Sequence, residues 1–176
     1  MSNKWILGAR PKTLPAAVVP VSLGTAAAFG ENVSLLSVAL CLIVALSLQV
    51  GVNYANDYSD GVRGNDGHER VGPLRLVGGG LATSSQVFKA SLIMFAIAAL
   101  SGLCLSLLTT FWLIPIGLIC IVGAWFYTGG SKPYGYRGLG EVSVFVFFGL
   151  IATNGSFFVQ TERLDIEPFL LSCSTG

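Results

Sequence analysis

The chain has 176 residues, of which 53% are hydrophobic and only 11% are charged, and its formal net charge is +1. A soluble domain carries roughly a quarter charged residues, so this composition, with a mean hydropathy of +0.73, excludes a soluble domain. We therefore expect an integral membrane protein with an all-α fold, which has the lipid bilayer as a partner and no nucleic-acid partner.

Five apolar runs are long enough to cross about 30 Å of hydrocarbon as helices, and they predict a polytopic transmembrane helix bundle. These runs are 14–29, 33–52, 89–109, 110–127 and 142–160. A sixth apolar segment begins at Pro168 and has only nine residues up to Gly176, too few to cross. We therefore expect residues 1–176 to form a single membrane domain that stops after five complete spans, as the N-terminal portion of a larger protein.

The basic residues predict the orientation of the bundle, because cytoplasmic loops collect lysine and arginine. With five spans, three segments share one side of the membrane: the one before the first span, the one between the second and third, and the one between the fourth and fifth. That side holds nine of the ten basic residues, namely Lys4, Arg10, Lys12, Arg63, Arg70, Arg75, Lys89, Lys132 and Arg137. The N-terminus is therefore expected on the cytoplasmic side of the cell membrane, with Arg163 on the opposite side.

A cluster of Asn and Asp follows the second apolar run, where residues 53–66 read NYANDYSDGVRGND. At about 100° per helical residue, four of these side chains share one helix face: Asn53, Asn56, Asp57 and Asp60. Gly61 and Gly64 allow the chain to leave the helix before Asp66. Because Mg²⁺ is usually held by one or two carboxylates plus substrate phosphates, the cluster predicts a site for a metal-bound diphosphate. The alternative is a capped helix end with solvated acids, but ionisable groups at membrane depth favour a functional role.

The first cytoplasmic loop is predicted from about residue 55 to 88, and it is too long to be a simple helix connection. It combines Arg70 and Arg75 with a run of glycines, and Thr83 or Ser84 can cap the helix that follows. We interpret this loop as a lid over a site. A flexible surface loop whose arginines only set the orientation is the alternative.

The second predicted cytoplasmic loop covers residues 128–141 and carries Lys132 and Arg137 among glycines and a proline. These two cations can present positive charge to a phosphate, although each can also be a membrane anchor that snorkels to the interface. Two basic loops and one acidic cluster thus share one side of the membrane. This combination suits a diphosphate that is neutralised by metal on one flank and by cations on the other.

Four stretches carry a recognisable pattern: 9–15 (ARPKTLP), 56–60 (NDYSD), 72–75 (GPLR) and 127–141 (YTGGSKPYGYRGLGE). Together they resemble the UbiA superfamily of intramembrane prenyltransferases, over essentially the whole chain. The acidic cluster is typical of the superfamily. The GPLR loop and the GLGE ending are similar to the branch that prenylates 1,4-dihydroxy-2-naphthoate in menaquinone biosynthesis.

The resemblance implies a bundle of about nine transmembrane helices around a lipid-open cavity, with two aspartate-rich motifs that hold Mg²⁺ against an isoprenyl diphosphate. Asn56, Asp57 and Asp60 match the first three positions of the first motif and are assigned as metal ligands. The fourth position is Gly64 here, and Asp66 is assigned as a ligand instead. The second motif is expected beyond residue 176, so we expect the chain alone to be inactive.

The implied reaction is Mg²⁺-dependent transfer of an isoprenyl chain from a polyprenyl diphosphate to 1,4-dihydroxy-2-naphthoate, with loss of CO₂, giving demethylmenaquinol. Asp57 and Asp60 are the expected catalytic residues, because the metal they hold draws charge from the diphosphate. Arg10 or Lys12 is expected to hold the acceptor's carboxylate. An aromatic face such as that of Tyr58, Tyr127 or Phe126 is expected to stabilise the allylic cation. The substrate-binding residues expected in all are Asn53, Asn56, Arg10, Lys12, Arg75, Tyr127, Lys132 and Arg137.

Other functions remain open from the sequence. Within the superfamily, the acceptor can instead be 4-hydroxybenzoate, homogentisate or haem. A membrane cation transporter can use Asp and Asn inside the membrane, but these acids lie at a helix end and run into a basic loop, which fits a phosphate better than a bare cation. A purely structural subunit would not need the Asn/Asp face. Isoprenoid length and oligomeric state do not follow from residue spacing.

Overall fold

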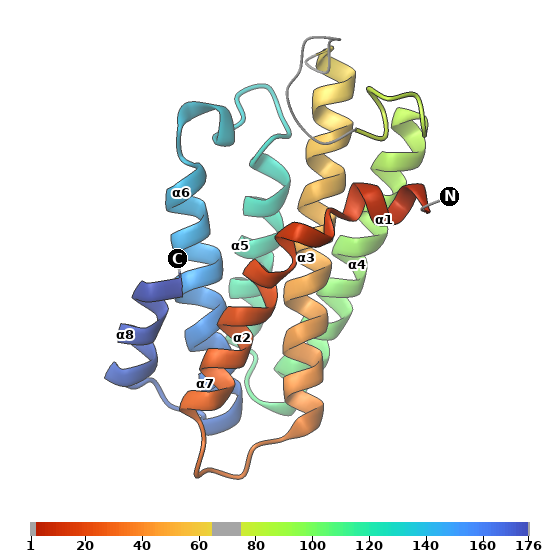
Figure 1. The fold of residues 1–176 in the computed structure, drawn as a ribbon. Helices are drawn as coiled ribbons and strands as arrows, with labels where there is room; N and C mark the ends of the chain where they lie inside the picture. Colours follow the sequence, from red (N-terminus) through yellow and green to blue (C-terminus); the bar gives the residue numbers. More distant parts are fainter. Residues whose placement is uncertain (1–2, 65–74, 176) are drawn as a thin grey trace.

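The structure is a computed structural model that describes residues 3–64 and 75–175. In these two ranges the chain forms helices that run side by side as a bundle (Figure 1). The elements are α1 (Lys4–Ala9), η1 (Pro11–Thr13), α2 (Pro15–Ala27), α3 (Leu35–Arg63), α4 (Ser84–Leu108), α5 (Leu113–Phe126), η2 (Gly135–Arg137), α6 (Gly140–Ser143), the π-helical η3 (Val144–Ala152), α7 (Thr153–Thr161) and α8 (Ile166–Thr175). The predicted all-α bundle is confirmed.

Three helical stretches are long and apolar enough to cross a membrane: α3, α4 and the continuous stretch Gly140–Thr161. The other two predicted spans form shorter apolar helices, since α2 has 13 residues and α5 has 14. A helix of that length rises about 21 Å, less than the roughly 30 Å of bilayer hydrocarbon. Helix α2 begins only at Pro15 because a 3₁₀ turn, η1, precedes it. Three of the five predicted spans therefore have full membrane length.

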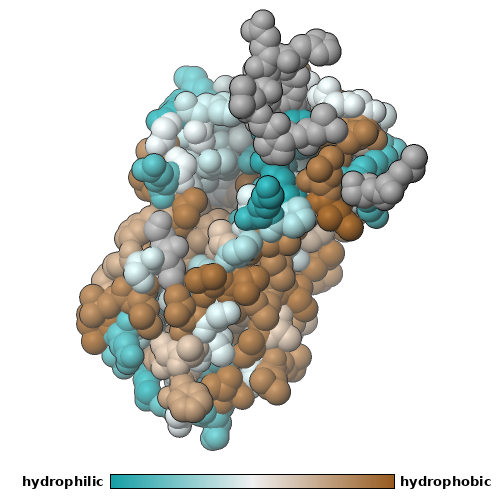
Figure 2. Space-filling view, in the orientation of Figure 1, coloured by the Kyte–Doolittle hydropathy of each residue, from teal (hydrophilic) through white to brown (hydrophobic). Residues whose placement is uncertain are grey.

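The surface of the bundle suits a lipid environment. Large apolar side chains are exposed on its outer faces, such as Leu100 and Leu107 of α4, each 65% exposed. Figure 2 shows hydrophobic residues over the middle and lower parts of the visible face, while hydrophilic residues gather toward the upper end. An apolar belt of this kind is what the hydrocarbon of a bilayer covers, in agreement with a membrane protein.

Helix α3 carries Asn53, Asn56, Asp57 and Asp60 on its last turns. The side chain of Ser34 caps its start by accepting from the Ser37 N–H across 3.3 Å. Its end is at Arg63, where Gly64 adopts a left-handed conformation with φ of 71° that favours glycine. The helix therefore reaches further than the loop boundary near residue 55 that the sequence suggested, and it holds Asp57 and Asp60 on rigid backbone.

Helices α3 and α4 pack closely because a small residue faces a large one between them. A side-chain carbon at Gly51 would lie 2.6 Å from the ring of Phe95, and the hydroxyl of Ser91 donates to the Gly51 carbonyl across 3.1 Å. Small residues let membrane helices approach in this way. The start of α4 is fixed by a capping box between Thr83 and Gln86. The prediction of a cap at this position is confirmed.

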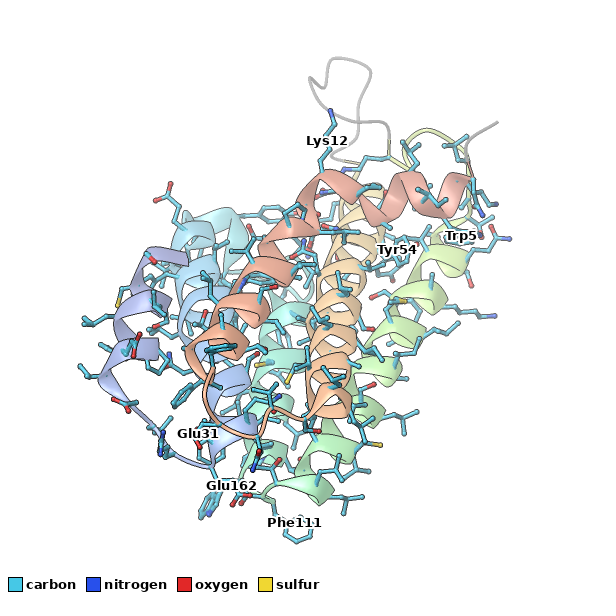
Figure 3. The ribbon with its side chains drawn as sticks, turned by 60° about the horizontal axis from the view of Figure 1, so that its bottom comes forward. Trp5, Lys12, Glu31, Tyr54, Phe111 and Glu162 are labelled. Atoms are coloured by element: carbon cyan, nitrogen blue, oxygen red, sulfur yellow. The ribbon has the colours of Figure 1, made fainter. Side chains whose placement is uncertain are left out.

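The two ends of the bundle differ in charge. Figure 3 shows Lys12 at one end and Glu31 and Glu162 at the other. At the acidic end Arg163 forms an exposed ion pair with Glu31 across 2.5 Å. The end of α3 and the starts of α2, α4 and α6 lie at the Lys12 end, which we call the polar end. Among described basic residues, those at or near the polar end are Lys4, Arg10, Lys12, Arg63, Arg75, Lys89, Lys132 and Arg137.

Candidate active site

A polar pocket of about 370 Å³ opens at the polar end of the bundle. It lies between the last turns of α3, the segment that begins at residue 75, and the connection between α5 and α6. Its lining residues are Asn56, Asp60, Arg75, Tyr127, Thr128, Gly135 and Tyr136. The three regions that the sequence singled out, namely the acidic cluster and the two basic loops, thus each contribute a wall.

Asp60 connects the two loops through its carboxylate. One oxygen, Oδ2, accepts from Nη2 of Arg75 across 2.7 Å, and the other, Oδ1, accepts from the hydroxyl of Tyr136. The side chains of Asp60 and Arg75 are both buried. Charge-assisted bonds of this kind are about twice as strong as neutral ones. Asp60 therefore holds a cation from the first loop and a phenol from the second at one point of the pocket.

Asn56 and Arg63 fasten the second loop to α3. The side-chain oxygen of Asn56 accepts from the hydroxyl of Thr128 across 2.6 Å. Arg63 donates to the carbonyls of Thr128 and Gly130 across 2.6 and 2.5 Å, and its guanidinium lies 5.5 Å from the ring centre of Tyr136. This spacing is a cation–π contact. The loop that supplies Tyr136 is thus held by the same two helix turns that supply Asp60.

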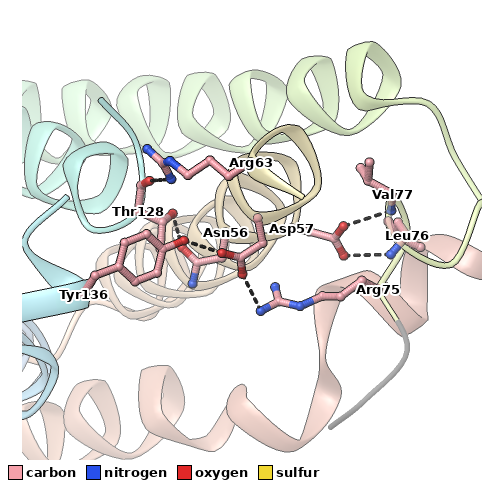
Figure 4. A network of polar contacts seen from close by, with 9 residues as sticks. Asn56, Asp57, Arg63, Arg75, Leu76, Val77, Thr128 and Tyr136 are labelled. Atoms are coloured by element: carbon pink, nitrogen blue, oxygen red, sulfur yellow. Dashed lines mark hydrogen bonds and ion pairs between the residues drawn. The ribbon is translucent and has the colours of Figure 1, made fainter. Parts of the chain in front are cut away.

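Asp57 has different surroundings from Asp60. Its two carboxylate oxygens accept from the backbone N–H groups of Leu76 and Val77, across 2.8 and 3.0 Å (Figure 4). The side chain is 1% exposed and does not line the polar pocket. Asp57 was predicted as a metal ligand and catalytic residue; that assignment stays a prediction, and its contacts are with the first loop.

Asn53 joins α3 to the turn between α1 and α2. Its amide nitrogen donates to the carbonyl of Ala9 across 2.9 Å and to the hydroxyl of Thr13 across 3.0 Å. Gln49, one turn earlier, donates to the same hydroxyl across 3.2 Å. Arg10 lies within this turn in a left-handed conformation, with φ of 52°. These bonds position the turn that carries Arg10 beside the interior of the bundle.

The remaining predicted site residues are divided between the pocket and the surface. Tyr127 lines the polar pocket, but the side chains of Lys12, Lys132 and Arg137 are exposed and do not line it. Asp66 lies outside the described residues. Within residues 3–64 and 75–175, no group of three or more His, Cys, Asp and Glu side chains is arranged to hold a metal ion.

Tyr136 and Thr128 are pocket residues that sequence reasoning missed. The second loop was interpreted through its cations, whereas the sequence YGY at 134–136 was the available signal. Partial burial, together with the hydrogen bond to Asp60 and its charge, raises the pKa of the Tyr136 hydroxyl above the usual value of about 10. Tyr136 is therefore a neutral hydrogen-bond donor to Asp60 at pH 7.

A second, larger cavity of about 700 Å³ lies next to the polar pocket, inside the bundle. Helices α2, α3, α4, α5 and the π-helical η3 line it, mostly with apolar side chains such as Leu48, Leu103 and Phe147. Asn56 and Tyr127 line both cavities and so mark the junction. A charged head in the polar pocket and an apolar chain in the larger cavity would meet at this junction.

Comparison with protein families matches residues 17–176 to the UbiA prenyltransferase family. A 1,4-dihydroxy-2-naphthoate octaprenyltransferase of Mycobacterium leprae is 52% identical over 174 residues, and one of Mycobacterium tuberculosis is 53% identical. Each of these alignments covers 98% of this chain and 59% of the relative. An Escherichia coli protein with the same description is 40% identical, over 93% of this chain and 55% of its own length. The chain therefore spans somewhat less than three-fifths of the length of these curated relatives.

Proposed function

Because the chain belongs to the UbiA prenyltransferase family, we propose that it serves the transfer of an isoprenyl chain from a polyprenyl diphosphate to 1,4-dihydroxy-2-naphthoate. Relatives described as 1,4-dihydroxy-2-naphthoate octaprenyltransferases, at 40–53% identity, support this acceptor. Release of diphosphate from the donor and of CO₂ from the acceptor would give demethylmenaquinol. The reaction belongs to menaquinone biosynthesis.

The observation that carries this proposal is that the two cavities are adjacent. The polar pocket contains a buried Arg75 and shares Asn56 and Tyr127 with an apolar cavity of about 700 Å³. A prenyl diphosphate has the same division into a charged head and a long apolar tail. A transported cation would need the polar pocket but would have no use for the apolar cavity, so this division favours a prenyltransferase over a cation transporter.

A divalent metal fits part of this pocket. UbiA prenyltransferases are generally metal-dependent, and we assign Mg²⁺ to Asn56 and Asp60, because both line the pocket with oxygen atoms. One carboxylate plus substrate phosphates is a common way to hold this ion. When bound, Mg²⁺ supplies charge neutralisation to the departing diphosphate. The predicted contributions of Asp57 and Asp66 are not needed for this assignment.

The chain's own residues bind and orient the substrates. Arg75 presents its guanidinium to the pocket and is assigned to the diphosphate, for which a planar, permanently charged donor is well suited. The hydroxyl of Tyr136 donates a hydrogen bond to Asp60 and holds that carboxylate at the pocket wall. Tyr127, at the junction of the two cavities, is assigned to the allylic cation that forms when the carbon–oxygen bond breaks. The electron-rich ring of the acceptor then attacks this cation.

The acceptor and the membrane orientation are further parts of the proposal. We assign the acceptor's carboxylate to Arg10 or Lys12, because Thr13 and Asn53 beside them line the apolar cavity. Lys132 and Arg137 are exposed residues of the second loop. We assign them to the capture of incoming diphosphate from solution. The polar end, which collects the basic residues, is assigned to the cytoplasm by the positive-inside rule.

An assay with competing acceptors tests this function. The protein that contains residues 1–176 is supplied in membranes with Mg²⁺, a polyprenyl diphosphate and equal amounts of 1,4-dihydroxy-2-naphthoate, 4-hydroxybenzoate and homogentisate. We expect demethylmenaquinol as the main product by mass spectrometry. Prenylated 4-hydroxybenzoate or homogentisate as the main product would refute the acceptor assignment, and the absence of every prenylated product would refute the reaction.

A further inference from the structure

We propose that Asp57 is a positioning residue, which docks residues 75–82 onto the end of α3 and thereby places Arg75 in the polar pocket. We call residues 75–82 the docked segment. The inference rests on the proposed function only for its kinetic consequence. The docking itself has observables of its own.

The carboxylate of Asp57 is fully engaged by the docked segment. Its oxygens accept from the N–H groups of Leu76 and Val77, two consecutive residues, at distances of 2.8 and 3.0 Å. Since the side chain is 1% exposed, water does not replace either bond. A buried carboxylate that loses such partners costs free energy, so α3 and the docked segment are held together at this point.

Side-chain packing fits the docked segment to the same surface. Leu76 is completely buried in a cluster with Tyr54 and Val87. On the last turns of α3, Gly61 faces Val77 so closely that a side-chain carbon at position 61 would lie 2.4 Å from a methyl group of Val77. The segment closes on itself, since the N–H groups of residues 81 and 82 both donate to the Leu76 carbonyl. It therefore docks as a compact unit.

Docking at Leu76 determines where Arg75 lies. Arg75 is the residue immediately before the first anchored amide, and its guanidinium meets Asp60, which is three residues after Asp57 on α3. One turn of helix thus carries both the anchor and the carboxylate that receives the arginine. Arg75 has a long, flexible side chain, and fixing its backbone reduces the conformations it must lose when it binds a phosphate.

This role differs in its consequences from that of a metal ligand. A ligand needs an oxygen lone pair that faces the metal, and Asp60 has its carboxylate in the pocket wall while Asp57 does not. Loss of a ligand lowers metal affinity. Loss of a positioning residue instead loosens the docked segment and weakens diphosphate binding, while metal affinity is retained.

The first test is Asp57→Asn in the protein that contains residues 1–176, in nanodiscs. The substituted amide keeps one acceptor oxygen but turns an NH₂ group toward the second backbone N–H. We expect hydrogen exchange at Leu76 and Val77 to accelerate by about tenfold or more, and the KM for the polyprenyl diphosphate to rise by about tenfold. The affinity for Mn²⁺ at saturating pyrophosphate, measured by electron paramagnetic resonance, should change less than twofold.

A second variant disturbs the docked segment without touching a carboxylate. Gly61→Ala introduces a methyl group against Val77, and the change itself favours the helical backbone of α3. We expect the same faster exchange and the same rise in KM. Adding Val77→Gly removes both the methyl group and the Cβ of residue 77, which lie 2.4 and 2.6 Å from the added carbon, and should restore both values toward wild type, with Val77→Gly alone as the reference. Glu31→Gln, a carboxylate change at the opposite end, is the matched control and should leave both values unaltered.

The two assignments for Asp57 give opposite results. Mn²⁺ affinity that falls as far in Asp57→Asn as in Asp60→Asn, with unchanged exchange at Leu76 and Val77, would overturn the proposal. So would a Gly61→Ala protein with normal exchange and normal KM. If the protein proves to have no prenyltransferase activity, the exchange and Mn²⁺ measurements still decide whether Asp57 anchors the segment, so failure of the function and failure of this inference are distinguishable.

Discussion

Arg75 lies 2.7 Å from Asp60 in an ion pair whose side chains are only 8% and 9% exposed. The second carboxylate oxygen of Asp60 is bonded to the hydroxyl of Tyr136. The groups assigned to the metal and to the diphosphate therefore neutralise each other in the structure. Breaking such a buried pair by removing one partner costs about 3–5 kcal/mol. Binding of the metal alone or of the diphosphate alone would break the pair, so the two ligands are expected to bind cooperatively.

Metal binding should accordingly depend on the diphosphate. A cation that approaches Asp60 alone must displace Arg75, whereas pyrophosphate offers Arg75 a new partner. We expect Mn²⁺ to bind at least about tenfold more tightly with pyrophosphate present, a difference of about 1.4 kcal/mol. Electron paramagnetic resonance measures the free ion directly. Equal Mn²⁺ affinity with and without pyrophosphate would contradict this coupling.

Arg75→Gln should separate the two halves of that coupling. Without the guanidinium, Asp60 is relieved of its ion pair, so Mn²⁺ affinity in the absence of pyrophosphate should rise. The KM for the polyprenyl diphosphate should also rise by about tenfold or more, because a charged hydrogen bond is worth about 1.5–3 kcal/mol. Steady-state kinetics with each substrate varied in turn provide the measurement. A rise confined to the KM of the naphthoate would mean that Arg75 serves the acceptor.

Asp60→Asn should abolish prenyl transfer, with a loss of about a hundredfold or more in kcat, since electrostatic stabilisation of a leaving group is lost. Arg75 then remains buried without its carboxylate, so the unfolding temperature of the purified variant must be compared with that of wild type. A variant that stays folded at the assay temperature and turns over normally at saturating Mg²⁺ would refute the catalytic assignment of Asp60.

Helix α3 shows which features of the site could be predicted from the sequence. Helical periodicity grouped Asn53, Asn56, Asp57 and Asp60 on one face. Of the two glycines predicted to end the helix, Gly61 lies inside α3 and Gly64 follows its last residue. The shared face and the helix end follow from local geometry. The different contacts of the four residues do not follow from local geometry, because they depend on which loop packs against each side chain in the folded protein. Asp57 meets residues 19 and 20 positions later in the chain, and Asp60 meets Tyr136, 76 positions later.

The same limit explains the second loop. Lys132 and Arg137 were predicted as phosphate ligands for their charge, but both are exposed, and it is Tyr136 of η2 that bonds to Asp60. Residue type alone predicts a phosphate contact for either cation. Arg63 holds this loop at the carbonyl of Thr128. The path of the loop therefore depends on tertiary contacts, which residue spacing in the sequence does not reveal.

Tyr136→Phe should change the pH dependence of the reaction at its alkaline end. The folded protein raises the pKa of this hydroxyl above about 10, so the bond to Asp60 is fully present below pH 10. It is lost as pH rises through the higher folded value. We expect kcat/KM of wild type to fall on that alkaline limb, and Tyr136→Phe to show a lower plateau without it. An identical alkaline limb in both proteins would exclude Tyr136 as its source.

Tyr127 lines both the polar pocket and the apolar cavity, so the proposed binding of the substrate would bring the bond that breaks close to its ring. Attraction between an aromatic face and a desolvated cation is worth about 2 kcal/mol, and the effect acts on the cation that forms during reaction more than on the neutral prenyl chain. Tyr127→Leu should therefore lower kcat by about thirtyfold with little change in the KM of the diphosphate. Tyr127→Phe retains the ring and should stay within a few-fold of wild type, which makes it the matched control. Single-turnover kinetics would separate a slower chemical step from slow product release. Equal losses of kcat in the two variants would show that the reaction requires the hydroxyl rather than the aromatic face.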